Sequence, residues 1–139
     1  MTTLIRKPTK TTPYVHLDAE TETFVIAGRS IPIDAELFYR PLLTWFEELD
    51  TKKVNRIDLC LRFDFFNIAS SKRILFILYR LAEIGKAGPK VSVRWMYEKS
   101  DDDLLEIGQD YAMMIEDIPF RFEPYEVGES KKAEYLKIG

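Results

Sequence analysis

The amino-acid sequence predicts a single α/β domain: a mixed, largely parallel β-sheet with helices mainly on one face and an N-terminal β-hairpin. Segments in which apolar and polar residues alternate are followed by segments with helical spacing, and this order implies crossovers onto a parallel sheet. Two of the alternating segments are apolar on one side only, whereas a sheet covered on both faces has strands that are apolar on both. The 139 residues match one domain of roughly 100–200 residues.

The N-terminal third predicts a hairpin followed by a helix. Residues 14–18 and 23–27 alternate as strands do, and the polar stretch between them can turn. The segment Gly28–Ser30 predicts a further turn. Asp34 can cap the helix that follows, in which Pro41 removes one backbone donor and predicts a bend or a restart.

The clearest strand is predicted over residues 56–65, where the alternation is uninterrupted. One face carries Ile57, Leu59, Leu61, Phe63 and Phe65. The other face carries Asp58, Cys60, Arg62 and Asp64. A strand over residues 91–97 repeats the pattern. The residues expected on the sheet face without helices are therefore Asp58, Cys60, Arg62, Ser92 and Arg94.

Two more helices are predicted, one before and one after the 91–97 strand. Asn67 can cap the first, which ends at the glycines of residues 85–88. Ser100 is expected to cap the second, and a short strand over residues 120–124 follows it. The predicted core includes Leu59, Leu61, Phe63, Leu78, Leu81, Val93 and Trp95.

Composition narrows the classes of function. The predicted domain covers residues 1–124, and residues 125–139 form a charged C-terminal tail. With 20 Lys and Arg against 23 Asp and Glu, the net charge of -3 gives no general attraction for nucleic acid. No apolar run approaches the roughly 20 residues that cross a bilayer, and the N-terminus lacks a signal segment, so we expect a cytoplasmic protein without membrane insertion.

Few side chains could support catalysis. His16 is the only histidine and is expected at the surface, and Cys60, the only cysteine, is expected to be a packing residue. A lone cysteine excludes an internal disulfide and a cysteine-rich zinc site. The acidic run 101–103 is better explained as the start of a helix than as a metal cluster. We therefore predict no catalytic residue, metal ligand or cofactor. An alternative is a small enzyme or ligand-binding protein that uses Cys60, His16 and the carboxylates.

The segment from Asp64 to Lys72 carries a strand end directly into a helix start. A phosphate attached there would lie where free backbone amides and the positive end of the helix dipole stabilise negative charge. Ser70 and Ser71 supply hydroxyl groups, although serine is also a common residue at the start of a helix.

A family resemblance bears on this segment. Residues 61–72, Leu-Arg-Phe-Asp-Phe-Phe-Asn-Ile-Ala-Ser-Ser-Lys, resemble the signature of the SiaC-type regulatory phosphoproteins, roughly L-R-[LF]-x-Y-[FL]-N-T-S-S-x-K. The resemblance spans about residues 8–124. Further matches, in the same order along the chain, are Thr12-Pro13, Ile31-Pro32, Trp45, the 91–97 strand, the acidic start of the third helix and Ile118-Pro119-Phe120.

The resemblance implies a fold similar to STAS domains and anti-sigma-factor antagonists, and a partner-switching role without enzymatic activity. In the family, a hydroxyl in this turn is phosphorylated by a Ser/Thr kinase of the anti-sigma-factor type, and a PP2C-type phosphatase removes the phosphate. The unphosphorylated form binds and stimulates a GGDEF diguanylate cyclase, which raises cyclic-di-GMP and favours biofilm growth. The partner-binding residues implied here are Asp64, Phe66, Asn67, Ile68, Ala69, Ser70, Ser71 and Lys72.

The sequence departs from the family pattern at the switch itself. The position of the acceptor threonine is occupied by Ile68, which has no hydroxyl, and the next serine is replaced by Ala69. Either phosphorylation has moved to Ser70 or Ser71, or this member stays unphosphorylated and able to bind its partner. We favour the second interpretation. A scaffolding STAS-like domain is a further alternative.

Overall fold

The computed structural model describes residues 3–126 of the chain. These residues include one mixed sheet with the strand order β1-β2-β3-β4-β5-β6. Its strands are β1 (Leu4–Arg6), β2 (Tyr14–Asp18), β3 (Thr23–Ser30), β4 (Arg56–Phe66), β5 (Lys90–Glu98) and β6 (Phe120–Tyr125). Between them lie α1 (Ala35–Glu47), the short 3-10 helix η1 (Thr51–Lys53), α2 (Ile68–Lys86) and α3 (Asp102–Met114). The predicted tail, apart from residues 125 and 126, lies outside the described residues.

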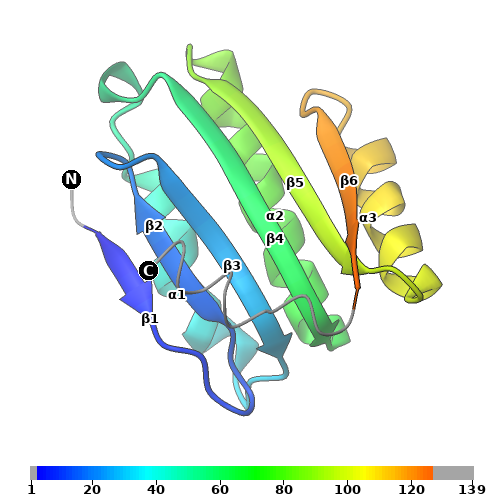
Figure 1. Ribbon diagram of the computed structural model, residues 1–139. Coiled ribbons are helices and arrows are strands. Elements are labelled where there is room, and N and C mark those ends of the chain that lie inside the picture. The colour runs from blue at the N-terminus through cyan, green and yellow to red at the C-terminus, as the bar shows by residue number, and fades with distance from the viewer. Residues whose placement is uncertain (1–2, 127–139) are drawn as a thin grey trace.

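The topology confirms the predicted fold class. Strands β1, β2 and β3 pair antiparallel, which includes the predicted hairpin, and β3 through β6 pair parallel. Each parallel pair is joined through a helix. Figure 1 shows α1, α2 and α3 on the same face of the sheet. Because β3 and β4 are parallel neighbours, α1 and α2 begin at the same edge of the sheet and pack against each other.

The core lies between the helices and the covered face of the sheet. All seven predicted core residues belong to it, and each exposes 1% or less of its surface. Trp95 anchors α3, because its indole N–H donates to the carbonyl of Leu104 at 3.0 Å. Gly108 lies against the same indole, where a Cβ atom would approach Trp95 Nε1 to 2.5 Å. Close contact between α3 and the sheet therefore requires glycine at this position.

The opposite face carries the polar side chains expected there. Ser92 Oγ donates to Asp58 Oδ1 at 2.7 Å, and Arg94 pairs with a carboxylate of β6. His16 lies on this face too, but its exposure is only 9% and its Nδ1 lies 3.1 Å from the Tyr14 hydroxyl. The expected surface position of His16 is therefore wrong: a neighbouring strand on each side and the Tyr14 ring enclose the imidazole.

The end of β4 departs from the predicted alternation. Gly28 pairs with Phe63 but Arg29 pairs with Phe65, so Asp64 is an additional residue on β4. Such a bulge reverses the side of the strand that the following residues face. Phe65 is consequently 53% exposed, whereas the alternation predicted it on the same face as Phe63. Phe66 instead packs on the Phe63 ring, at 5.1 Å between centroids.

Two other expectations about local structure are wrong, and a third is narrowed. The segment Gly28–Ser30 continues β3 instead of turning, with Gly28 at φ 118°. The third helix is capped by Asp101, whose carboxylate accepts from the Leu104 amide at 3.0 Å, and not by Ser100. Helix α1 runs through Pro41 without a restart, which leaves the bend as the other outcome that the proline predicts.

The sequence also left the first strand unpredicted. Leu4–Arg6 pairs with β2 and extends the sheet at its antiparallel edge. At the other edge, β6 includes Tyr125, one residue past the expected end of the domain. The Tyr125 ring is buried beneath the Arg62 guanidinium, whose Cζ lies 4.0 Å from the ring centroid.

Candidate functional site

The start of α2 is fixed to the neighbouring strand by its cap. Asn67 Oδ1 accepts from the Ser70 amide at 2.9 Å, as an N-cap side chain does. The backbone N–H of Asn67 in turn donates to the Ser30 carbonyl at 3.1 Å. These two bonds hold the first turn of α2 against the carboxyl end of β3, so the geometry of the predicted switch segment is set by β3 as well as by β4.

Ile68, the first residue of α2, extends into solvent. Its side chain is 88% exposed, an unusual position for an isoleucine. On the adjacent α1 start, Leu37 is 65% exposed and Ile33 is fully exposed. Because α1 and α2 begin at the same sheet edge, that end of the molecule presents apolar side chains to solvent from both helix starts. Exposed apolar groups gathered in this way are typical of an interaction surface.

Ser70 has the opposite environment. It is completely buried, and its hydroxyl donates to the Ser30 carbonyl at 3.0 Å and accepts from Ser30 Oγ at 2.8 Å. Because the single hydroxyl proton of Ser30 is used in that bond, the Tyr39 hydroxyl is the donor to Ser30 Oγ, at 2.6 Å. Burial raises the pKa of Tyr39 well above its ordinary value, which keeps this donor protonated.

Ser71 is only partly buried. Its hydroxyl donates to the Ile68 carbonyl at 2.9 Å, and its own carbonyl accepts from the Tyr111 hydroxyl of α3 at 2.9 Å. Burial raises the pKa of Tyr111 to about 12. A cleft of about 260 Å³ separates the α2 start from α3 and is lined by Phe66, Asn67, Ile68, Ser71, Ile107, Asp110, Tyr111 and Met114.

The remaining predicted partner-binding residues surround Ile68. Asp64, Ala69 and Lys72 are exposed, whereas Phe66 and Asn67 are half-buried. The bulge at Asp64 lets Phe66 face the core while the chain enters α2. The structure thus presents seven of the eight predicted residues wholly or partly to solvent, and Ser70 lies beneath them.

The groups of the alternative catalytic interpretation are not brought together. Val25 on β3 pairs with His16 on one side and with Cys60 on the other. The backbones of His16 and Cys60 are therefore two strand spacings apart, about 10 Å. Cys60 Sγ contacts Met96 Sδ at 3.6 Å. Within residues 3–126, no three His, Cys, Asp or Glu side chains are placed to hold a metal ion. No helix in that range is long and apolar enough to cross a membrane.

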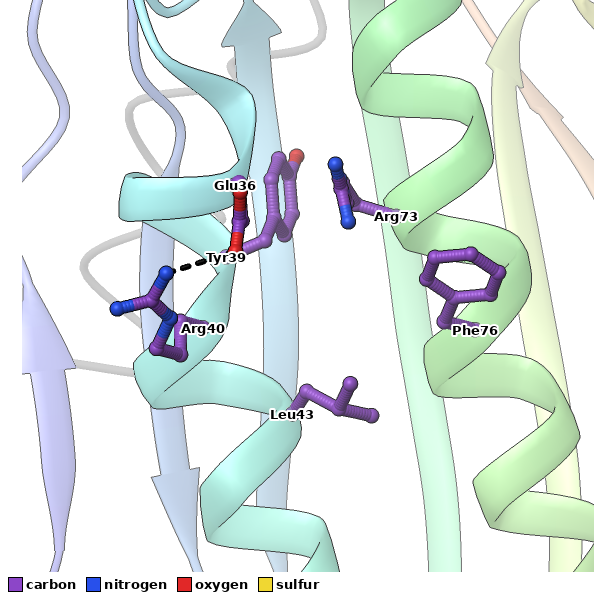
Figure 2. A pocket seen from close by; sticks show the side chains of 6 residues that line it. All are labelled: Glu36, Tyr39, Arg40, Leu43, Arg73 and Phe76. Carbon is purple, nitrogen blue, oxygen red and sulfur yellow. Dashed lines mark hydrogen bonds and ion pairs between the residues drawn. The ribbon is translucent and has the colours of Figure 1, made fainter.

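Sequence reasoning missed a second groove, of about 200 Å³, which lies between α1 and α2 (Figure 2). Its lining residues are Glu36, Tyr39, Arg40, Leu43, Arg73 and Phe76. Helical spacing was the available signal, because Arg73 and Phe76 follow the buried Ser70 at intervals of three and so share its side of α2.

Comparison with known proteins gives consistent results. A curated relative, an uncharacterised protein of Pseudomonas aeruginosa strain UCBPP-PA14, is 26% identical over 114 residues, which cover 82% of this chain and 88% of the relative. Apo-SiaC from Pseudomonas aeruginosa has a similar structure, with a TM-score of 0.79 and 24% identity over 88% of this chain and 99% of that one.

Two further solved structures are similar. A chain in the structure of diguanylate cyclase SiaD with its activator SiaC from Pseudomonas aeruginosa has a TM-score of 0.79 and 23% identity, over 88% of this chain and 99% of that one. Another structure of SiaC from that organism has a TM-score of 0.73 and 26% identity, over 91% of this chain and 99% of that one. The family model of SiaC family regulatory phosphoproteins matches residues 6–125. The chain described here therefore belongs to the SiaC family of regulatory phosphoproteins.

Proposed function

We propose that this protein is a non-enzymatic, cytoplasmic regulator that binds and stimulates a GGDEF diguanylate cyclase. Membership of a family of regulatory phosphoproteins supports this function, as does the fold shared with SiaC in its complex with the cyclase SiaD. The proposed binding surface is the start of α2 from Asp64 to Lys72, with Ile68 at its centre.

The observation that carries the proposal is the exposure of Ile68. A large apolar side chain that is 88% exposed contributes little to the fold, because almost none of its surface leaves water on folding. Covering it with a partner would remove that apolar area from water. At the same position the family pattern has the acceptor threonine, so contact with a partner and phosphorylation would compete for one site.

We propose further that Ile68 keeps this member unphosphorylated. A phosphate in the turn would add about -1.5 to -2 charge at neutral pH, stabilised by the α2 amides but opposed by the nearby Asp64 carboxylate. A partner would have to desolvate that charge in order to bind. Without a hydroxyl at position 68, a kinase of the anti-sigma-factor type and a PP2C-type phosphatase have no group to modify there.

The burial of Ser70 supports this interpretation over a relocated switch at Ser70. Both of its hydrogen bonds would have to break before a kinase could reach the hydroxyl. Ser71 is the more accessible alternative, although its hydroxyl is already bonded to the Ile68 carbonyl.

The test uses the parent protein, Ile68→Thr, and Ile68→Val as a control that is branched like threonine but lacks a hydroxyl. Each is incubated with the anti-sigma-factor-type kinase of the same host and ATP and then weighed by intact mass spectrometry. Binding to the host GGDEF cyclase and the rate of cyclic-di-GMP synthesis are measured before and after treatment.

We expect all three proteins to stimulate the cyclase before treatment. Afterwards, only Ile68→Thr should carry a phosphate and lose binding. A parent protein that neither binds nor stimulates the cyclase would reject the function. Stoichiometric phosphate on Ser70 or Ser71 of the parent, with loss of binding, would keep the function and reject the unphosphorylated state.

A further inference from the structure

The groove between α1 and α2 lies beside the two helix starts, whereas Ile68 itself lines the cleft on the α3 side of α2. Arg73, on the α2 side of the groove, follows Ile68 by five residues, about 7.5 Å along the helix axis. On the α1 side, Arg40 follows the exposed Leu37 by three residues and so shares its side of the helix. A partner segment lying over the two helix starts would reach this groove.

Arg73 is the distinctive group in the groove. Its Nε is buried, and no acceptor among the described residues hydrogen-bonds to it. Figure 2 shows the guanidinium extending from α2 into the space between the helices, toward Tyr39. Its Cζ lies 5.6 Å from the centroid of the Phe76 ring, which supports the head group from one side.

The one carboxylate that lines the groove is already engaged. Glu36 Oε1 lies 2.7 Å from Arg40 Nη2, one turn along α1, and Figure 2 marks this bond. With Glu36 neutralising Arg40, the charge of Arg73 is left over, and the exposed Lys72 adds to it. The groove is therefore electropositive and holds a buried donor that finds no acceptor among residues 3–126.

A buried donor without an acceptor is unfavourable, and a carboxylate is the group that best satisfies a guanidinium, through two parallel N–H···O bonds. The space of about 200 Å³ can take one such side chain. Leu37 and Ile68 do not line the groove, but their exposed apolar side chains lie on the starts of the two helices that form it. Such apolar surface favours a carboxylate carried on a protein segment over a free ion.

We propose that the groove between α1 and α2 receives an acidic side chain of the bound partner, and that Arg73 is the residue that recognises it. This inference rests on the proposed function, and it adds the chemistry of the partner: an aspartate or glutamate next to the apolar residues that cover Ile68.

The experiment measures affinity for the host GGDEF cyclase by surface plasmon resonance at two salt concentrations. The first variant, Arg73→Met, keeps a long unbranched side chain but removes the charge and the donors. The second, Arg73→Lys, keeps the charge but lacks the buried Nε donor. Arg56→Met is the matched control, since Arg56 is exposed at the start of β4, at the other end of the sheet. Thermal melts of the free proteins are recorded with and without inorganic phosphate.

We expect Arg73→Met to weaken binding at least about tenfold, because the lost pair is charged and desolvated. The salt dependence of the affinity should also become flatter, because the variant carries one positive charge fewer toward the partner. Arg73→Lys should recover only part of that loss, and Arg56→Met should stay within about twofold. The free Arg73→Met protein should melt no lower than the parent, since the change removes a buried donor that lacks an acceptor.

Other outcomes are separable. If the parent protein does not bind the cyclase, the proposed function fails, and this inference fails with it. If the parent binds but Arg73→Met behaves like Arg56→Met, only the role of the groove is rejected. A third outcome is that phosphate raises the melting temperature of the parent but not that of Arg73→Met, while Arg73→Met keeps the parent's affinity for the cyclase. That result would also overturn the inference and assign the groove to a small anion.

Discussion

Ser70 and Ser30, forty residues apart, form a closed pair of hydrogen bonds inside the protein. Ser70 Oγ donates to the Ser30 carbonyl at 3.0 Å, and Ser30 Oγ donates to Ser70 Oγ at 2.8 Å. The same Ser30 carbonyl also accepts from the Asn67 amide, the residue that caps α2. The start of the candidate switch helix is thereby attached to the end of β3 through polar contacts that water does not reach.

The first prediction concerns the stability that this pair supplies. Ser70→Ala should lower the free energy of unfolding by about 1–3 kcal/mol, because the buried Ser30 hydroxyl loses its acceptor. Urea unfolding followed by tryptophan fluorescence measures the change. Ser71→Ala is the control and should stay within about 0.5 kcal/mol, since Ser71 is partly exposed. If Ser70→Ala lowers the free energy of unfolding no more than the control does, the pair does not stabilise the fold.

The same pair marks the limit of what the sequence could predict about the site. Asn67 predicted the start of α2 correctly, because a cap is a local signal. The burial of Ser70 depends on Ser30, which belongs to β3, and nothing near residue 70 distinguishes it from Ser71. The groove at Arg73 likewise depends on how α1 packs against α2, which periodicity does not specify.

The fold itself was predictable wherever one face of an element is buried. Leu59, Leu61 and Phe63 alternate because the core selects every second residue of β4. The bulge at Asp64 leaves no trace in that alternation, so Phe65 was incorrectly assigned to the same face of the strand as Leu61 and Phe63. A signal for the irregularity was present in Gly28, which was interpreted as a turn but provides positive φ within a strand.

A second prediction concerns pH. Hydrogen bonding from Arg94, whose Nη2 lies 2.9 Å from Glu123 Oε1, holds the pKa of the Glu123 carboxyl below its ordinary value. A carboxyl whose pKa is lower in the folded state stabilises the fold above its unfolded pKa of about 4.3, and this contribution is lost as the pH falls through the folded value. The side chains are 31% and 36% exposed, so the contribution is below about 1 kcal/mol.

Unfolding free energies of the parent and Glu123→Gln, measured from pH 7 to pH 3, check this. The difference between the two proteins should be constant above about pH 5 and shrink below about pH 4. Glu116→Gln is the matched control, because Glu116 is exposed and makes no ion pair with any of residues 3–126. A difference that grows on acidification would contradict the direction of the pKa shift.

The last prediction separates folding from partner binding at position 68. The first turn of α2 contains no acidic residue, although the helix dipole favours one there. Ile68→Asp removes a side chain that is 88% exposed, so little buried apolar surface is lost. We therefore expect the free energy of unfolding to rise by about 0.3–1 kcal/mol at low salt.

Affinity for the cyclase should fall in the same variant, because a carboxylate would replace the apolar side chain that we propose the partner covers, and it would have to lose its hydration. Met113→Asp is the control for the dipole. Met113 is 70% exposed near the last residue of α3, where a negative charge faces the negative end of a helix, so that variant should lose stability. An Ile68→Asp protein that unfolds more easily than the parent would show that Ile68 contributes to the fold. Stability that rises while binding falls would assign Ile68 to the partner.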